Sequence, residues 1–225
     1  MNCMKRIFIL IALVFTGFLV ANAQSSKNYL FADEIKAFKK LDSATFPAKK
    51  QILFAGSSSF RKWTNVQSDF PDHKIINRGF GGSTLSDVIY YADDIIFPYH
   101  PKQIVIYCGE NDIASSDTIT AVIMLKRYQQ LFFLIRSKMK RVEIDFVSIK
   151  PSPSRAKFRA TVERSNQLIK DFIAKQKHAK YINVFDAMLN EDGTIKQEIF
   201  LKDDLHMNEK GYAIWQKIIE PYLKK

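Results

Sequence analysis

The 225-residue sequence is poor in cysteine, with one near its N-terminus and one at position 108. Cys3 falls in a segment that we predict to be removed, which leaves Cys108 alone and excludes a disulfide within the chain. Histidine is scarce too, and no further metal ligands cluster around Asp203, Asp204 and His206. Because a bound metal needs several converging ligands, no metal site is predicted. The stability of the fold must therefore come from an apolar core.

Long hydrophobic runs are also missing, except for residues 7–20, which follow Lys5 and Arg6. These 14 residues fall short of the roughly 20 that span a membrane, and they end on Ala21-Asn22-Ala23. We predict a signal peptide at residues 1–23, cleavage before Gln24, and export to the periplasm or the medium. An uncleaved anchor helix is disfavoured because no basic flank follows the apolar run at once. A lipid anchor is not expected either, because there is no cysteine at the cleavage point.

The sequence also lacks a basic cluster with interleaved aromatic residues, although basic residues outnumber acidic ones by 34 to 23. Without Lys5 and Arg6 the net charge is 32 minus 23, or +9. Scattered basic residues favour solubility and loose attraction to anionic glycan or lipid surfaces, and they argue against nucleic acid as a partner. There is no internal repeat or interdomain linker. We therefore expect residues 24–225 to form a single domain.

Apolar, β-branched or aromatic runs predict five buried strands, of which the last is the weakest. They lie at Gln51–Ala55, Lys74–Asn77, Gln103–Cys108, Val142–Ile149 and Tyr181–Phe185. Segments with helical spacing separate them, at residues 85–96 and 158–172, and further helices are expected at residues 29–41 and 209–222. Buried strands alternating with amphipathic helices predict a doubly wound α/β fold with a parallel sheet.

Three polar, glycine-bearing turns follow the first three predicted strands. Their sequences are Gly-Ser-Ser-Ser (56–59), Asn-Arg-Gly-Phe-Gly-Gly-Ser (77–83) and Gly-Glu-Asn-Asp (109–112). Open α/β sheets bind ligands at the carboxyl ends of their strands, and glycine allows close backbone approach. The turns are therefore expected to meet at a ligand site, although each taken alone resembles an ordinary tight connection.

His206 follows Asp203 by three residues, just before Asn208, a candidate N-cap for the closing helix. A carboxylate at this spacing can accept the Nδ1 proton of the imidazole and leave Nε2 free as a base. Asp204 is the competing carboxylate. The other three histidines lie among charged residues and are predicted to be on the surface: His73, His100 and His178.

The base requires a nucleophile, and the candidates are Ser57, Ser58 and Ser59 in the first turn. Donors for a negatively charged tetrahedral intermediate are available as the backbone N–H of Gly82 and the side-chain amide of Asn111. The G-x-S-x-G elbow of α/β-hydrolases is absent, because Phe60 stands at the position of its second glycine.

The order of Ser, Gly, Asn and then Asp-x-x-His resembles the SGNH hydrolases, also called GDSL-like lipases or esterases, over residues 52–215. The resemblance implies Ser58 as nucleophile, Asp203 and His206 as its triad partners, and an oxyanion hole formed by Ser58 N–H, Gly82 and Asn111. It also implies a three-layer α/β/α fold with a five-stranded parallel flavodoxin-like sheet, and no metal or cofactor.

Ser57 departs from the family pattern, which usually has aspartate before the nucleophile. The turns at residues 76–88 and 109–112 look similar to the platelet-activating-factor-acetylhydrolase-like and carbohydrate-esterase branches, which remove short acyl groups. We therefore expect an exported serine esterase acting on short acyl esters of a glycan or lipid-derived substrate. A catalytically weak carbohydrate-binding module and an acyltransferase on the same triad are the alternatives.

Other residues near the turns are ambiguous in the sequence. Cys108 is expected to be a buried structural thiol. Arg78 and Glu110 are expected either to pair beneath the site or to face solvent. Aromatic residues flank the turns and are expected either to line a pocket or to pack in the core: Phe60, Trp63, Phe80 and Tyr107.

Overall fold

The computed structural model describes residues 30–225, so the predicted signal peptide lies outside the described residues. Residues Phe31–Lys225 form one compact unit. Within the described chain, no helix is both long and apolar enough to cross a membrane.

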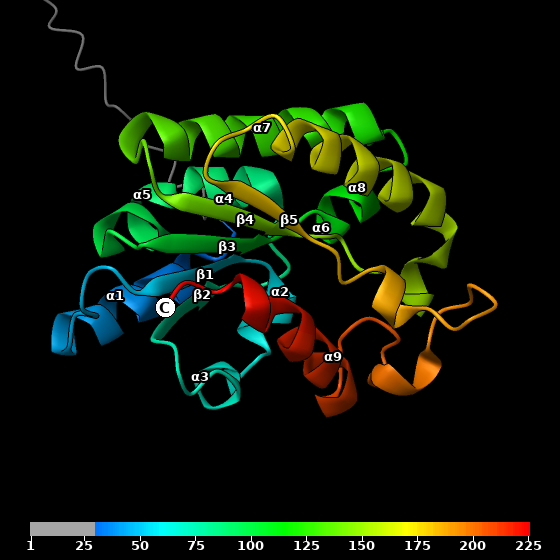
Figure 1. Ribbon diagram of the computed structural model, residues 1–225, viewed down its shortest axis with the longest axis horizontal. Coiled ribbons are helices and arrows are strands. Elements are labelled where there is room, and N and C mark those ends of the chain that lie inside the picture. Colours follow the sequence, from blue (N-terminus) through cyan, green and yellow to red (C-terminus); the bar gives the residue numbers. More distant parts are fainter. Residues whose placement is uncertain (1–29) are drawn as a thin grey trace, which may run out of the picture. The chain divides into compact units, whose positions relative to one another are not determined.

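A five-stranded, all-parallel sheet lies at the centre of this unit, with the strand order β2-β1-β3-β4-β5 (Figure 1). The strands are β1 (Ile52–Gly56), β2 (Ile75–Gly79), β3 (Gln103–Tyr107), β4 (Glu143–Val147) and β5 (Ala179–Ile182). Every residue of β1, β3 and β4 is buried, as expected for parallel strands covered on both faces. The predicted doubly wound fold with a flavodoxin-like strand order is confirmed.

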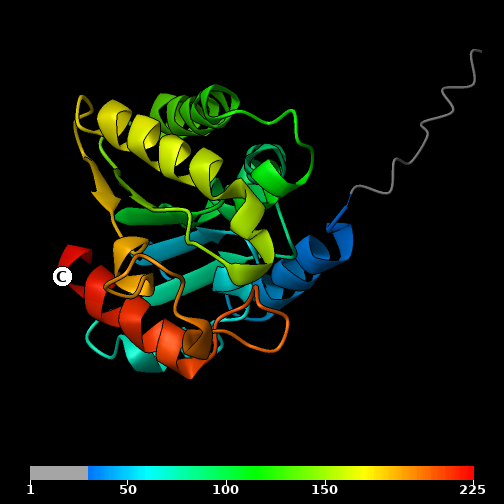
Figure 2. The ribbon, with the colours of Figure 1, turned by 90° about the vertical axis from the view of Figure 1, so that its right-hand side faces the viewer.

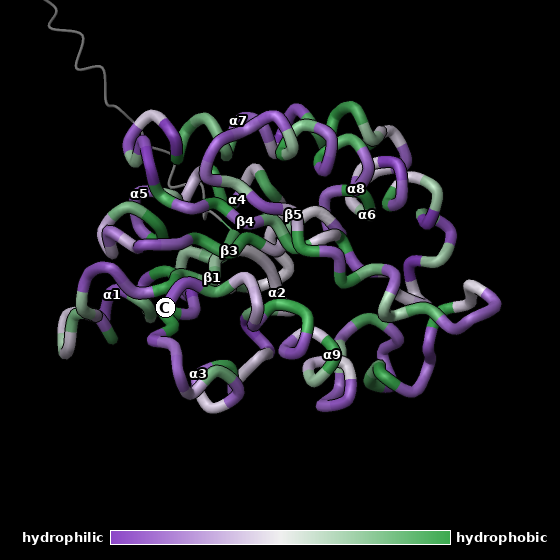
Figure 3. The backbone as a smooth tube through the Cα atoms, in the orientation of Figure 1, coloured by the Kyte–Doolittle hydropathy of each residue, from purple (hydrophilic) through white to green (hydrophobic). Residues whose placement is uncertain are grey.

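Helices cover both faces of the sheet (Figure 1). Ile35 of α1 (Ala32–Ala44) shares one core with residues of α4 (Leu85–Tyr90), α5 (Ala92–Ile95), α7 (Ala121–Lys138) and α8 (Arg159–Ile173). The core on the other face includes residues of α2 (Ser58–Arg61), α3 (Val66–Asp69) and α9 (Glu209–Ile219). Helix α6 (Glu110–Ala114) follows β3 directly. Hydrophobic residues concentrate along the strands between these layers (Figure 3).

The strand predictions are correct in order and number, and their ends differ from the observed ones by at most three residues. The helix expected over residues 85–96 is divided, because α4 ends at Tyr90 and α5 begins at Ala92. The closing helix ends at Ile219, and a 3-10 turn follows at Glu220–Tyr222. The 18-residue helix α7 was not singled out from the sequence.

Helix-capping residues fix where the chain leaves the sheet. The Thr84 side chain accepts from Asp87 N–H in a capping box at α4, and Asn208 accepts from the backbone of Lys210 and Gly211 at α9. The connections that follow β1, β2 and β3 all emerge at the carboxyl edge of the sheet, which Figure 2 views from the outside. This is the edge at which a ligand site was expected.

Candidate active site

Ser58 occupies the sharp turn between β1 and α2. Gly56 has φ +139°, and a Cβ atom there would lie 1.9 Å from the carbonyl oxygen of Tyr107, so only glycine fits. Ser57 N–H donates to that same oxygen at 2.9 Å, and helix α2 begins at the next residue. Ser57 and Ser59 are each only 2% exposed, whereas Ser58 is half-buried. The turn therefore presents Ser58 to the site.

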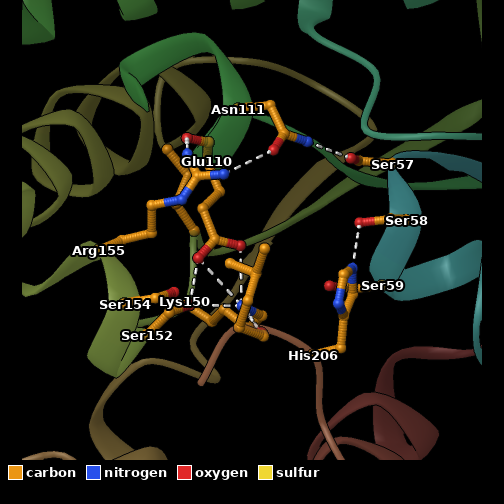
Figure 4. A network of polar contacts seen from close by, with 12 residues as sticks. Ser57, Ser58, Ser59, Glu110, Asn111, Lys150, Ser152, Ser154, Arg155 and His206 are labelled. Carbon is orange, nitrogen blue, oxygen red and sulfur yellow. Dashed lines mark hydrogen bonds and ion pairs between the residues drawn. The ribbon is translucent and has the colours of Figure 1, made fainter. Parts of the chain in front are cut away.

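Ser58, His206 and Asp203 form a continuous hydrogen-bond chain, and Figure 4 shows its link between Ser58 and His206. The Oγ of Ser58 lies 3.1 Å from Nε2 of His206, and Nδ1 of His206 lies 2.6 Å from Oδ2 of Asp203. The other carboxylate oxygen of Asp203 accepts the backbone N–H groups of Leu205 and His206. Asp204 does not replace it, because its backbone carbonyl is held by Ser154 and its side chain makes no ion pair in the described structure.

The acidity of Asp203 follows from these contacts. Burial raises its pKa, but the hydrogen bonds from the His206 ring and from two backbone N–H groups outweigh burial and lower the pKa to about 2. The carboxylate is therefore ionised at neutral pH and fixes the tautomer in which Nδ1 carries the proton.

The three expected oxyanion donors lie close to this chain. A Cβ atom on Gly82 would lie 3.6 Å from Nδ2 of Asn111, which places the Gly82 turn directly against that amide. The same Nδ2 donates to Ser57 Oγ at 2.8 Å and to Ser83 O at 3.3 Å. Ser58 is the first residue of α2, so its N–H has no acceptor within the helix. The geometry thus suits stabilisation of a negative oxygen beside Ser58.

Comparison with known proteins settles the family. The model of the GDSL-like lipase/acylhydrolase family matches residues 42–214. The chain belongs to this family. No curated protein matches the chain significantly in sequence.

Solved structures share the fold of this GDSL-like chain. A protein of Streptococcus pneumoniae described as a platelet activating factor has a TM-score of 0.75 at 22% identity, covering 89% of this chain and 97% of its own. A GDSL-like lipase of Bacteroides thetaiotaomicron has a TM-score of 0.69 at 20% identity, covering 84% and 96%. A variant acetyl xylan esterase of Geobacillus stearothermophilus has a TM-score of 0.59 at 13% identity, covering 76% and 94%.

Sequence analysis missed a buried lysine that links two parts of the site in this GDSL-like chain. Lys150, which follows β4, has a fully buried side chain and donates to both Glu110 oxygens at 3.0 and 2.8 Å. It also donates to the backbone carbonyl of Leu205 at 2.8 Å, next to His206. Burial lowers the pKa of Lys150, whereas Glu110 opposes that change. Its position at the carboxyl end of the fourth strand was the signal that could have identified it.

Neither alternative left open for Arg78 and Glu110 is correct, because both side chains are buried and they do not pair with each other. Arg78 bonds Asp42 and Tyr99 far from the triad, where it ties α1 to β2. The other carboxylate beside Asn111, Asp112, is fully buried and accepts from Leu85 N–H at 2.9 Å and from Arg127 at 2.7 Å. Burial raises the pKa of Asp112, while these two donors oppose the rise.

Glu34 of α1 forms a further link that the sequence did not reveal. It accepts from Gly81 N–H at 3.1 Å and pairs with Arg61 of α2 at 2.9 Å. The turn that carries Gly82 and the helix that carries Ser58 are thereby connected through the first helix.

Cys108 and the aromatic residues that flank the turns are packed in the core. Cys108 is buried, and burial raises its pKa. The four flanking aromatic residues are each at most 2% exposed and belong to the core: Phe60, Trp63, Phe80 and Tyr107.

His100 and His178 are exposed as predicted. His73 is not, because it is 8% exposed and its Nδ1 contacts the backbone oxygen of Lys224. Within the described residues, no group of three His, Cys, Asp or Glu could hold a metal ion.

Proposed function

We propose that the protein is an exported serine esterase that hydrolyses short-chain, acetyl-type oxygen esters of a glycan or lipid-derived substrate. The observation that carries this proposal is the hydrogen-bond chain from Ser58 through His206 to Asp203, next to the Asn111 amide. A serine hydroxyl becomes a useful nucleophile when an oriented imidazole removes its proton.

The reaction follows from this geometry in two stages. His206 Nε2 takes the hydroxyl proton as Ser58 Oγ attacks the ester carbonyl, and the N–H groups of Ser58, Gly82 and Asn111 hold the oxyanion. Collapse of the tetrahedral intermediate expels the alcohol, which receives the proton from His206. Water, activated by the same imidazole, then attacks the acyl-enzyme and releases the acid and the free Ser58 hydroxyl. Asp203 remains ionised and stabilises the imidazolium in both stages.

The preference for short acyl groups rests on the residues beside the three turns of the site. A long acyl chain needs an apolar pocket that buries most of its surface. The aromatic residues that could have walled a larger pocket are instead packed in the core.

The decisive experiment measures hydrolysis of acetyl, butyryl and octanoyl esters of one phenol. We expect kcat/KM to be highest for acetyl, and turnover to fall by about 10⁴ to 10⁶ in Ser58→Ala and His206→Ala. Ser59→Ala is the matched control, because Ser59 is the adjacent buried serine and its loss should be mild. A fluorophosphonate probe should label Ser58. Activity that survives Ser58→Ala but not Ser59→Ala would show that the nucleophile is misplaced, and an octanoyl preference would defeat the short-acyl proposal.

A further inference from the structure

We propose that Arg155 is a specificity-determining residue that binds an anionic group, a carboxylate or a phosphate, on the alcohol side of the scissile ester. This inference rests on the proposed function and specifies its substrate class. It is carried by the position of Arg155 at the oxyanion hole and by the absence of a carboxylate partner for it in the described residues.

Arg155 lies in the 3-10 segment Pro153–Phe158, which follows β4 and leads into α8. Its guanidinium points at α6, with Nη2 3.4 Å from Oδ1 of Asn111 and Nη1 3.4 Å from the backbone oxygen of Glu110 (Figure 4). Both contacts are long and go to neutral oxygens. They occupy two of the five N–H donors of a guanidinium, so the planar fork retains donors for a further ligand.

The carboxylates in the hydrogen-bond network of the site are already paired. Three carboxylates each have a cationic or imidazole partner, in the pairs Glu110–Lys150, Asp112–Arg127 and Asp203–His206. Arg155 has no carboxylate within 4 Å among the described residues, and Asp204, on the neighbouring loop, is exposed and forms no such pair with it. The positive charge of Arg155 nevertheless acts on a buried group, because its repulsion contributes to lowering the pKa of Lys150.

Charges taken out of water are normally paired in proteins, and a guanidinium matches carboxylate and phosphate groups in a bidentate manner. Arg155 is half-buried and has no such partner among the described residues. An anion of the substrate would supply the missing partner. An acetyl group has no atom beyond its methyl to carry that charge, so the anion must belong to the alcohol. The same guanidinium holds Oδ1 of Asn111, which leaves Nδ2 directed at Ser57 and the oxyanion hole.

The test compares three acetyl esters with similar phenolic leaving groups. The esters of 4-hydroxybenzoate and of 4-hydroxyphenyl phosphate carry an anion, and the ester of methyl 4-hydroxybenzoate is their neutral counterpart. The ratio of kcat/KM for each anionic ester to that for the neutral ester is measured in the unaltered protein, in Arg155→Gln and in Arg155→Lys. Comparing ratios between proteins cancels the intrinsic reactivity of each leaving group. Lys157→Gln is the matched control, because it removes the same charge from an exposed pair with Asp117.

We expect Arg155→Gln to lower the ratio at least about tenfold for an anionic ester, mainly through KM, with an intermediate value for Arg155→Lys and no change for Lys157→Gln. An effect confined to the carboxylate ester identifies an acidic alcohol as the substrate, and one confined to the phosphate ester identifies a phosphorylated alcohol. Unchanged ratios for both would overturn the inference, even if kcat fell equally for all esters, since Arg155 would then only orient Asn111.

A binding measurement separates this inference from the proposed function. Calorimetric titration with 4-hydroxybenzoate and with 4-hydroxyphenyl phosphate should give binding of at least one anion to the unaltered protein that weakens at least about tenfold in Arg155→Gln. This readout does not need turnover. If the protein hydrolysed none of the esters, the proposed function would fail, while equal affinity of the two proteins for both anions would reject the anion site.

Discussion

Two carboxylates on either side of Asn111 are both buried in ion pairs, yet they hold different parts of the site. Glu110 reaches Lys150, whose side chain is 0% exposed and which also holds the Leu205 carbonyl beside His206. Asp112 reaches Arg127, which is 26% exposed, and holds Leu85 N–H at the start of α4, just after the Gly82 turn. The first pair therefore positions the base, and the second positions the oxyanion turn. Only the second has solvent close to its cation.

This difference predicts that the Lys150 pair is the more costly to break. Lys150→Met leaves Glu110 as an uncompensated buried charge, so the free energy of unfolding should fall by about 3–5 kcal/mol. Turnover should fall as well, because the Leu205 carbonyl loses its donor and the loop carrying His206 is released. Urea denaturation and ester hydrolysis measure the two effects. In Lys150→Met/Glu110→Gln the buried charge is gone, so part of the lost stability should return.

Arg127→Met is the matched control for this comparison. Asp112 keeps the hydrogen bond from Leu85, and water can approach from the exposed side of Arg127, so the loss should be about 1–3 kcal/mol. If Arg127→Met destabilised the fold as much as Lys150→Met, the burial of the cation would not be what separates the two pairs.

The residue between the pairs should affect the reaction rather than the fold. Asn111→Ala should lose about 2.7–4 kcal/mol of transition-state stabilisation, seen mainly as lower kcat, because an oxyanion donor acts on charge that develops during the reaction. Thermal unfolding should change little, since the Glu110 and Asp112 pairs remain. A variant with raised KM and normal kcat would show that Asn111 binds substrate instead.

The contrast between these residues also explains what could be predicted from the sequence. The five strands were recognisable because continuous apolar runs have few other structures available, and the turns after them are fixed by topology. Ser58, Asn111 and His206 were identified because each lies in a turn with a chemical reason for its residue type. The contacts of Lys150 and Glu34 were missed because their partners are 40 and 47 positions away, although the place of Lys150 after the fourth strand already pointed to the site. The partner of Arg78 was not foreseen for the same reason, since Arg78 lies in β2 and Asp42 in α1, 36 positions away.

A third buried carboxylate, that of Asp145, differs from Glu110 and Asp112 because no cation pairs with it in the part of the chain that the structure describes. Asp145 of β4 is fully buried; Oδ2 accepts from Gln103, whereas Oδ1 has no partner. Burial raises its pKa from 3.8 to about 7. Between these two values the folded protein retains a proton that the unfolded chain releases. The contribution of Asp145 to stability therefore falls as pH rises from about 4 to 7.

Asp145→Asn imitates the protonated carboxyl and should remove this pH dependence. Since one unit of pKa corresponds to about 1.4 kcal/mol and the shift is about three units, the variant should be more stable at pH 8 by on the order of 4 kcal/mol, and little changed at pH 4. Urea denaturation at the two pH values measures this difference. Equal effects of the substitution at pH 4 and pH 8 would mean that Asp145 does not titrate in this range.

The smallest effect is expected at Ser57, which acts on the reaction only through Asn111. Its hydroxyl accepts from Nδ2 of Asn111 at 2.8 Å, but Ser83 O accepts from the same atom, so Ser57→Ala removes one of two restraints on the amide. We expect kcat to fall only a few-fold, equivalent to about 1 kcal/mol or less, with KM unchanged. Because the two residues form one unit, Ser57→Ala/Asn111→Ala should be no slower than Asn111→Ala alone. Additive losses in this cycle would mean that Ser57 contributes to the reaction independently of Asn111, and the serine found at the usual aspartate position would then need a role of its own.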